Sequence, residues 1–472
     1  MGDNHCDLGL IGLGVMGRNF LLNLADHGFA LTGYDLDPDK VKQLNREKSD
    51  KQEIHPAEHL ADFVAKLRRP RAIMLLVPAG EAVDSVIDEV TPLLDLGDLI
   101  IDSGNSHFKD TDRRSKKLEG QSLLFMGMGM SGGEYGARHG PSIMPGGSQE
   151  GYGRVENMLS RAAAQVDGKP CVAHLGKGSA GHYVKMVHNG IEYGIMQLIA
   201  ETYDLLKRSL GFSAHDLHDI YREWNSQELS SYLVEITSHI FATADEKTGE
   251  PLVEVILDAA KQKGTGKWTE WDATDLQVPT PTIDAAVAMR NLSGLKRERQ
   301  QAAEYLRGPS ATYGGDGQKF AGQLKDALYS GMILTYAQGM ALLRVASNHY
   351  GYELDLATVA RIWRGGCIIR ASLLENIYSV LSSGPDLPNL LMSQDFAEEV
   401  MGRQSQLRAV VSAAVQMGLP VPALAESLSY FDGYRSGRLP ANLIQAQRDY
   451  FGSHTYERTD AQGTFHTQWR KD

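Results

Sequence analysis

Residues 184–194, VKMVHNGIEYG, place four polar side chains in a stretch that is otherwise apolar. A helix turns about 100° per residue, so all four would share one face if this stretch is helical. They are Lys185, His188, Asn189 and Glu192. A base and an acid on one face suit proton transfer in both directions. A Lys–Glu pair beside two structural polar groups remains the alternative from this stretch alone.

A second motif, GLGVMG at residues 12–17, follows an apolar stretch and opens an amphipathic one. Gly12 allows a tight turn, Gly14 lets a pyrophosphate approach the backbone, and Gly17 lets a helix pack on a strand. The N–H groups at the start of that helix would face the phosphates. The motif therefore predicts a dinucleotide site rather than a chance glycine turn.

An acidic residue, Asp35, ends the next predicted strand, 18 residues after Gly17. A carboxylate at this point accepts hydrogen bonds from free ribose hydroxyls and repels a 2′-phosphate. Leu36 and Asp37 follow it, so no arginine stands there to pair with a phosphate. Lys40 is the nearest cation, and we expect it to be a solvated residue at the start of the next helix.

Two further polar loops, DSGNS (102–106) and SGG (131–133), follow predicted strands. Ligands of an open parallel sheet bind outside the carboxyl ends of its strands, where both loops fall. Asn105 can donate an amide hydrogen bond. Ser131, Gly132 and Gly133 offer a hydroxyl and accessible N–H groups to a carboxylate. Taken alone, each loop could equally be an ordinary turn.

Short apolar runs alternate with amphipathic stretches over the first part of the chain, which predicts βαβ units and a parallel sheet. The predicted strands are residues 7–12, 29–35, 71–77, 98–102 and 122–129. From about residue 180, long helical periodicities replace this alternation. We expect an α/β Rossmann-like domain (1–179), a large all-α domain (180–437) and a C-terminal tail (438–472) that packs on another surface.

The composition of the chain excludes several classes of protein. Its 472 residues exceed what one core supports, and a net charge of −12 argues against a nucleic-acid surface. Cys6, Cys171 and Cys367 are far apart, which fits a reducing compartment without zinc or disulfides. We find no signal peptide or membrane span and expect a cytoplasmic protein. We expect Trp268, Trp363 and Cys367 to be packing residues.

Longer motifs resemble one known family. They are IIDSGNS, MSGGEYGARHGPSIMPGG, SAGHYVKMVHNGIEYG, QKGTGKWT, WRGGCIIR and LPANLIQAQRDYFGSHTY. The motifs follow one another in the family's order. From residue 7 to about 470, the chain resembles the decarboxylating 6-phosphogluconate dehydrogenases of the oxidative pentose phosphate pathway. The resemblance implies conversion of 6-phosphogluconate to ribulose 5-phosphate and CO₂ with reduction of a nicotinamide coenzyme. It also implies a homodimer with a shared active site and no metal.

The resemblance assigns roles to individual residues. It makes Lys185 the general base and Glu192 the general acid. The implied substrate-binding residues are Asn105, Ser131, Gly132, Gly133, His188, Asn189, Tyr193, Lys263, Thr265, Arg290, Arg448 and His454, of which the last two reach into the neighbouring subunit's site. The predicted coenzyme contacts are Gly12, Gly14, Val15, Met16, Gly17, Asp35, Leu36, Asp37, Val77, Pro78, Ala79 and Asn105.

The chain departs from the family at the coenzyme site. Most members carry Asn-Arg-Ser or Asn-Arg-Thr where this chain has Asp35-Leu36-Asp37. The family's arginine pairs with the 2′-phosphate of NADP, whereas two carboxylates would repel that phosphate. We therefore predict that NAD is favoured over NADP.

Two other functions remain to be weighed. One is a β-hydroxyacid dehydrogenase acting on a smaller, unphosphorylated acid, in which the cations Lys263, Arg290 and Arg448 would lack a partner. The other is a non-catalytic nucleotide-binding protein, which would not need an acid and a base on one helix face. An assay with 6-phosphogluconate separates all three.

Overall fold

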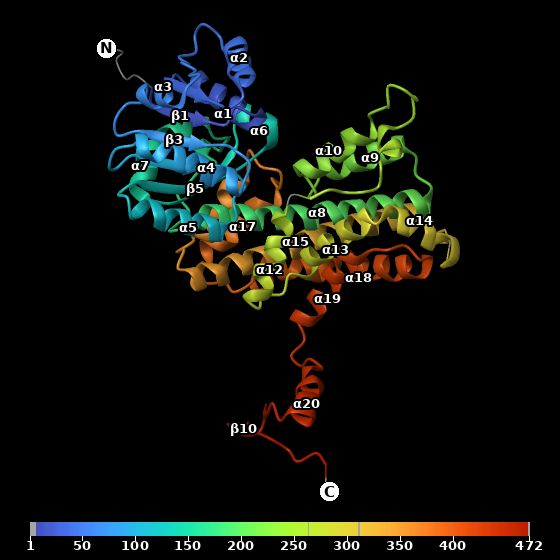
Figure 1. Cartoon of the computed structure of the whole chain (residues 1–472). Coiled ribbons are helices and arrows are strands. Elements are labelled where there is room, and N and C mark those ends of the chain that lie inside the picture. Colours follow the sequence, from blue (N-terminus) through green and yellow to red (C-terminus); the bar gives the residue numbers. More distant parts are fainter. Residues whose placement is uncertain (1–5, 263, 310–311, 471–472) are drawn as a thin grey trace.

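The computed structural model of the chain describes residues 6–262, 264–309 and 312–470. An α/β part comes first, a large helical part follows, and the C-terminal segment extends away from both (Figure 1). This arrangement confirms the predicted fold class, a Rossmann-like α/β part followed by an all-α part. In the described portion of the chain, no helix is long and apolar enough to cross a membrane.

The α/β part is built on a six-stranded sheet in the order β2-β1-β3-β4-β5-β6. The first five strands pair in parallel, so their carboxyl ends lie along one edge. The strands are β1 (Leu8–Ile11), β2 (Leu31–Tyr34), β3 (Ala72–Leu75), β4 (Leu99–Asp102), β5 (Leu124–Ser131) and β6 (Ser142–Gly147).

Helices cover both faces of this sheet, and apolar side chains fill the space on each side. The helices of this part are α1 (Val15–Asp26), α2 (Pro38–Glu47), α3 (Leu60–Ala65), α4 (Glu81–Val90), α5 (Phe108–Glu119), α6 (Gly133–His139) and α7 (Gln149–Ala162).

The sequence did not predict β6, which pairs antiparallel with β5. Its segment reads SIMPGG, and proline and glycine are typical of turns. Proline is tolerated at the edge of a sheet, and β6 is an edge strand in which Pro145 lies opposite Met128. Residues 132–141 are too short a connection for a parallel crossover, which explains the antiparallel direction.

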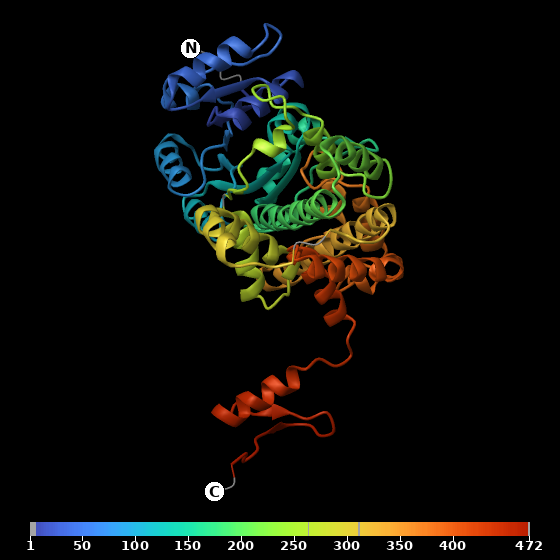
Figure 2. The same ribbon diagram turned by 90° about the vertical axis from the view of Figure 1, so that its right-hand side faces the viewer.

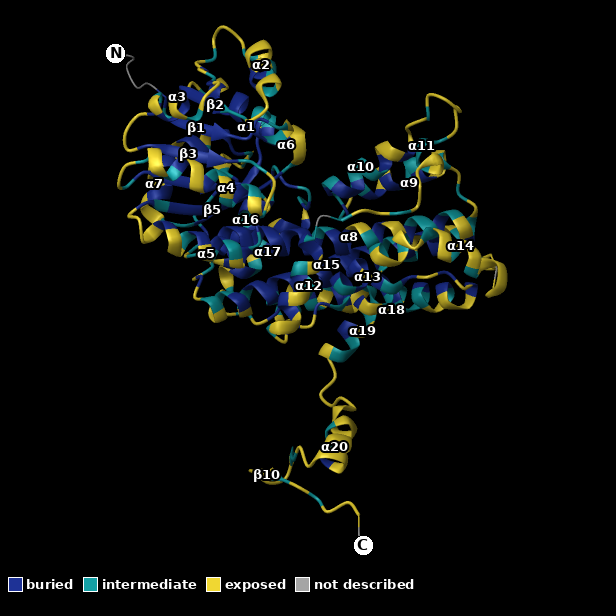
Figure 3. Cartoon of the chain, viewed as in Figure 1, coloured by how far each residue is buried: buried dark blue, intermediate teal, exposed yellow. Residues whose placement is uncertain are grey.

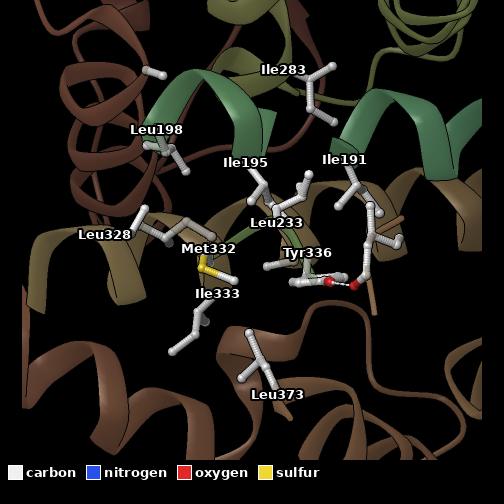
Figure 4. Close-up of a cluster of buried hydrophobic side chains, with 14 of the residues drawn as sticks. Ile191, Ile195, Leu198, Leu233, Ile283, Leu328, Met332, Ile333, Tyr336 and Leu373 are labelled. Atoms are coloured by element: carbon white, nitrogen blue, oxygen red, sulfur yellow. Dashed lines mark hydrogen bonds between the residues drawn. The ribbon is translucent and has the colours of Figure 1, made fainter. Parts of the chain in front are cut away.

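Two long helices, α8 (Ala180–Leu210) and α15 (Gly317–Tyr350), form the centre of the helical part. Figure 4 shows Ile195 and Leu198 of α8 close to Met332 of α15 in the apolar core. The other helices are α9 (Ala214–Asn225), α10 (Tyr232–Phe241), α11 (Leu252–Val255), α12 (Thr265–Asp275), α13 (Pro281–Gly294), α14 (Lys296–Tyr305), α16 (Leu356–Trp363), α17 (Leu373–Ser383), α18 (Gln394–Met417) and α19 (Pro422–Tyr434).

The first turns of α8 pack on the sheet, and glycines make this contact very close. An added Cβ atom at Gly129 of β5 would lie 2.4 Å from Lys185 Cβ. One at Gly181 of α8 would lie 2.3 Å from the carbonyl oxygen of Gly127, and one at Gly146 of β6 would lie 2.3 Å from the Gly181 nitrogen. The helix therefore rests on the backbones of β5 and β6, and Lys185 lies beside β5.

The tail forms a small unit away from the rest of the chain (Figures 1 and 2), with most of its surface exposed (Figure 3). It comprises α20 (Ala441–Gly452) and a hairpin of β9 (Tyr456–Glu457) and β10 (Thr464–Phe465). The buried carboxylate of Asp449 holds this unit together. Its hydrogen-bond partners are the backbone N–H groups of Thr455 and Thr467 and the side chains of His466 and Trp469.

A second buried carboxylate connects α8 to α19, the helix that leads into the tail. Glu201 of α8 accepts hydrogen bonds from the N–H groups of Ala423 and Leu424 at 2.8 and 2.9 Å. A negative charge suits the start of a helix, but burial raises the pKa of Glu201 to about 7. This contact fixes α19, and with it the exit of the tail, relative to α8.

We expect Gly129→Ala to destabilise the protein, because the new methyl group would collide with the Cβ atom of Lys185. Overpacking of this kind costs about 1–3 kcal/mol, which thermal denaturation measures. Gly153→Ala is the matched control, because Gly153 is exposed within α7 and its added Cβ has no described atom within 4 Å. Equal melting temperatures for the two variants would contradict the close contact.

Glu201 should make stability depend on pH. Its folded pKa of about 7 lies above the ordinary value of 4.5, so the folded state binds the proton more tightly and stability falls as pH rises between these values. The difference corresponds to roughly 3 kcal/mol. Because Glu201→Gln cannot ionise, its melting temperature relative to the wild type should rise over this range. A difference that stays constant with pH would contradict this expectation.

Candidate active site

The structure brings the four polar side chains of residues 184–194 together on one face of α8. Lys185 Nζ donates to Asn189 Oδ1 at 2.6 Å and lies 3.3 Å from His188 Nδ1. Glu192 Oε2 lies 3.9 Å from His188 Nδ1. The first three side chains are buried and Glu192 is half-buried. A base and an acid are thus within reach of one ligand.

Burial shifts the pKa of each titratable group in this cluster. It lowers the pKa of Lys185, an effect that the Glu192 carboxylate opposes. Burial and the Lys185 ammonium together hold the pKa of His188 well below its usual value. Burial raises the pKa of Glu192, while Lys185 and Arg290 act in the opposite direction. Every shift favours the uncharged form, in which the lysine can accept a proton and the carboxyl can donate one.

Ser131 connects the end of β5 to this face of α8. Its Oγ lies 3.1 Å from His188 Nε2 and accepts a hydrogen bond from the N–H of Ile368 at 3.4 Å. Gly132 and Gly133 follow with φ values of +120° and +62°, which glycine adopts without strain. The three residues predicted to bind a carboxylate therefore lie where β5 turns into α6, beside the polar face of α8.

A cationic group lies next to the same face. The Arg290 guanidinium of α13 stacks 3.3 Å from the centre of the Tyr193 ring. Thr265 is buried at the start of α12, and an added Cβ at the adjacent Gly266 would lie 2.4 Å from Tyr193 Cδ2. A guanidinium and two hydroxyl groups suit a phosphate. Lys263, predicted to join them, lies outside the described residues.

A cavity of about 1070 Å³ opens at the carboxyl edge of the sheet, where ligands of this fold bind. Every residue that the sequence predicted to contact a dinucleotide lines it, although their binding role stays a prediction. These residues are Gly12, Gly14, Val15, Met16, Gly17, Asp35, Leu36, Asp37, Val77, Pro78, Ala79 and Asn105. We call this space the dinucleotide cavity.

The glycine-rich turn at the cavity fits a dinucleotide. Gly12 has a φ of +103°, and an added Cβ at Gly17 would lie 1.9 Å from the Gly12 carbonyl oxygen, so α1 packs directly on the turn. A Cβ at Gly14 would meet no described atom within 4 Å. No side chain among the described residues caps the start of α1, which leaves its N–H groups for a phosphate.

Asp35 lines the cavity, and its carboxylate already has protein partners. Its Oδ2 accepts a hydrogen bond from the N–H of Leu13 at 2.7 Å, and its Oδ1 accepts one from the N–H of Asp37 at 2.9 Å. Lys40 Nζ lies 3.3 Å from Asp35 Oδ1 and also lines the cavity. Lys40 lies at the start of α2 with a partly exposed side chain, as expected, and it also pairs with Asp35, which the sequence did not predict.

Both tryptophans that we expected to pack do contact the helical core, but they differ in burial. Trp363 and Cys367 are buried, as predicted, and burial raises the pKa of the Cys367 thiol to about 12. Trp268 is half-buried against the same core and also lines the dinucleotide cavity, edge-on to His107 with 4.9 Å between ring centres. The signal that we missed was its position one helical turn after Thr265, which places both residues on one face of α12.

Arg448 and His454 do not approach this cluster within one chain. Both are exposed in the tail unit, which extends away from the helical part (Figure 2). Arg448 donates to Gln445 Oε1 at 3.2 Å, and the His454 ring lies edge-on to Phe451. Their assignment to a neighbouring subunit's site stays a prediction.

Family models match nearly the whole chain. Residues 7–176 match the NAD binding domain of 6-phosphogluconate dehydrogenase, and residues 181–469 match its C-terminal domain. A decarboxylating 6-phosphogluconate dehydrogenase of Synechococcus elongatus is 55% identical over 98% of both chains. An NADP(+)-dependent one of Bacillus subtilis is 48% identical over 98% of this chain and 99% of the relative.

A solved structure is similar over the same extent. It is the 6-phosphogluconate dehydrogenase of Plasmodium falciparum, determined in its apo form and in complex with NADP+ and with 6-phosphogluconate. It superposes with a TM-score of 0.96 at 41% identity, covering 98% of this chain and all of the other. These matches confirm the resemblance in the sequence motifs, and the chain belongs to the 6-phosphogluconate dehydrogenase family.

Proposed function

We propose that this chain oxidises and decarboxylates 6-phosphogluconate to ribulose 5-phosphate and CO₂ while reducing a nicotinamide coenzyme. The observation that carries the proposal is the buried Lys185, 2.6 Å from Asn189 Oδ1 and on the same helix face as Glu192. A neutral lysine and a protonated carboxyl supply the base and the acid that this reaction requires. Family membership supports the same reaction.

Lys185 acts first as a base. Burial lowers its pKa, which favours the neutral amine that takes the proton of the C3 hydroxyl. A nicotinamide coenzyme held in the dinucleotide cavity would supply the acceptor for the hydride that leaves C3. Asn189 and His188 hold the substrate hydroxyls next to the amine, which keeps the reacting atoms aligned.

Lys185 then acts as an acid, and Glu192 completes the reaction. The ammonium formed on Lys185 stabilises the developing charge on the C3 oxygen while the C1 carboxylate leaves as CO₂. The enediol that remains is renumbered, since its first carbon was C2 of the substrate. Glu192 protonates this carbon, which becomes C1 of ribulose 5-phosphate. Burial raises its pKa, which favours the protonated carboxyl that this step requires.

The other predicted site residues are assigned to the remaining groups of the substrate. Ser131, Gly132 and Gly133 hold the substrate carboxylate, and Asn105 lies between the substrate and the nicotinamide. Tyr193, Lys263, Thr265 and Arg290 hold the phosphate. Arg448 and His454 complete the site from the second subunit of a homodimer. In this assignment residues 1–179 bind the coenzyme, residues 180–437 bind the substrate and form the dimer, and residues 438–472 contact the partner.

The coenzyme that we propose is NAD, and the charge around the cavity supports this choice. Asp35, Asp37 and Glu89 line it with carboxylates, whereas Lys40 is the one cation among its described lining residues. Lys40 is already paired with Asp35, so a 2′-phosphate would meet net negative charge. The relative from Bacillus subtilis is NADP(+)-dependent, so a preference for NAD would distinguish this chain from that member of the family.

We expect Lys185→Met to abolish turnover while leaving coenzyme binding unchanged, because Lys185 is not among the residues that line the dinucleotide cavity. General acid–base catalysis contributes about 10²–10⁴-fold, and Lys185 serves two steps. Lys177→Met is the control, since Lys177 is exposed and pairs with Glu353. Steady-state rates with 6-phosphogluconate test this, and near wild-type activity of Lys185→Met would remove the residue from its role.

The coenzyme prediction is tested by kcat/KM with NAD and NADP. We expect wild type to favour NAD by about 100-fold, the combined effect of charge repulsion and a missing arginine. Asp35→Asn with Leu36→Arg should shift the ratio toward NADP. Lys40→Gln leaves the Asp35 carboxylate without its cation, so kcat/KM with NADP should fall slightly and the preference for NAD should remain; the exposed Lys42→Gln is the control. A wild type that prefers NADP, and loses that preference in Lys40→Gln, would instead assign the 2′-phosphate to Lys40.

A further inference from the structure

A buried arginine lies behind the wall of the dinucleotide cavity without touching it. Arg114 of α5 is 1% exposed and is not among the residues that line the cavity. A guanidinium has five N–H donors, and each of the five hydrogen bonds of Arg114 can be assigned to a different one. They join Nε to Asp84 Oδ1 (2.9 Å), Nη1 to Asp102 Oδ2 (3.2 Å) and Ser106 Oγ (3.1 Å), and Nη2 to Gly80 O (2.9 Å) and Asp84 Oδ2 (3.1 Å).

These partners belong to two separate pieces of the cavity wall. Gly80 and Asp84 belong to the start of α4, whose residues Ala82, Ser85, Val86 and Glu89 line the cavity. Asp102 and Ser106 bound the loop that carries Ser103, Gly104 and Asn105 into the cavity. One guanidinium therefore fixes the distance between α4 and the Asn105 loop.

Hydrogen bonds to Asp102, one of the partners of Arg114, shape the Asn105 loop. Asp102 is fully buried and accepts hydrogen bonds from Ser106 Oγ at 2.7 Å and from the N–H of Gly104 at 3.2 Å. The Arg114 guanidinium also holds the pKa of the Asp84 carboxyl well below its usual range. A buried ion pair adds little stability compared with apolar packing of the same volume, so its contribution here is to geometry.

We propose that Arg114 is a positioning residue for the coenzyme, which sets the opening between α4 and the Asn105 loop without contacting the ligand. The inference rests on the proposed function, since Asn105 lies between the nicotinamide and the substrate. A displacement of about 1 Å at such a site can cost about 100-fold in rate. Arg114 therefore affects coenzyme affinity and the rate of oxidation, and leaves the phosphate end of the substrate site unchanged.

Arg114→Lys tests this proposal because it keeps the charge but cannot form the same five directed hydrogen bonds. The matched control is Arg113→Lys, since Arg113 is half-exposed, is adjacent in sequence and also pairs with Asp84. We expect Arg114→Lys to weaken binding of reduced coenzyme, followed by its fluorescence, by about tenfold or more. Calorimetric affinity for 6-phosphogluconate should fall by much less than coenzyme affinity, because Asn105 is the one proposed substrate contact on the displaced loop, and Arg113→Lys should match wild type in both.

Two further variants test α4 and the Asn105 loop one at a time. They can be measured even if Arg114→Lys fails to fold. Asp84→Asn loosens α4 and should weaken coenzyme binding more than it lowers kcat. Ser106→Ala loosens the Asn105 loop and should lower kcat more than it weakens binding. Unchanged coenzyme affinity and kcat in these variants, or equal loss of coenzyme and 6-phosphogluconate binding, would overturn the proposal. Coenzyme titration needs no turnover, so a wild type inactive on 6-phosphogluconate would contradict only the proposed function.

Discussion

The close contact between α8 and the edge of the sheet is the constraint on which the rest of this structure depends. Gly129 and Gly181 leave no room for a side chain between the helix and the strands β5 and β6. Any larger residue would separate them, and Ser131 Oγ could no longer lie 3.1 Å from His188 Nε2. The sheet supplies the dinucleotide cavity and the helix supplies Lys185 and Glu192, so their spacing decides whether one ligand can contact both.

Burial determines the electrostatics of the site. Burial disfavours charge on any group, so it lowers the pKa of Lys185 and raises the pKa of Glu192 at the same time. Burial alone therefore accounts for the direction of both pKa shifts. Arg290, which stacks on Tyr193, retains its positive charge nearby because a guanidinium does not lose its proton in proteins.

Local patterns in the sequence predicted much of this arrangement. The glycine spacing at residues 12–17 and the helical spacing of Lys185 and Glu192 depend on neighbours within a few turns, so they can be read directly. The features that escaped prediction depend on long-range contacts. β6 forms because β5 lies next to it, and Arg114 joins Gly80 and Asp102 across 34 and 12 positions of the chain. Hydrophobic periodicity carries no information about such polar contacts.

The tail unit has a consequence for the order in which the protein folds. The hydrogen bonds to Asp449 join residues 6 to 20 positions apart, whereas the sheet and α8 are connected across 57 positions at Ser131 and His188. Local contacts form faster because closing a short loop loses less entropy. The tail should therefore be structured early, independently of the slower α/β part. Two chains that associate through it would meet as ordered surfaces, which reduces the entropy lost on association.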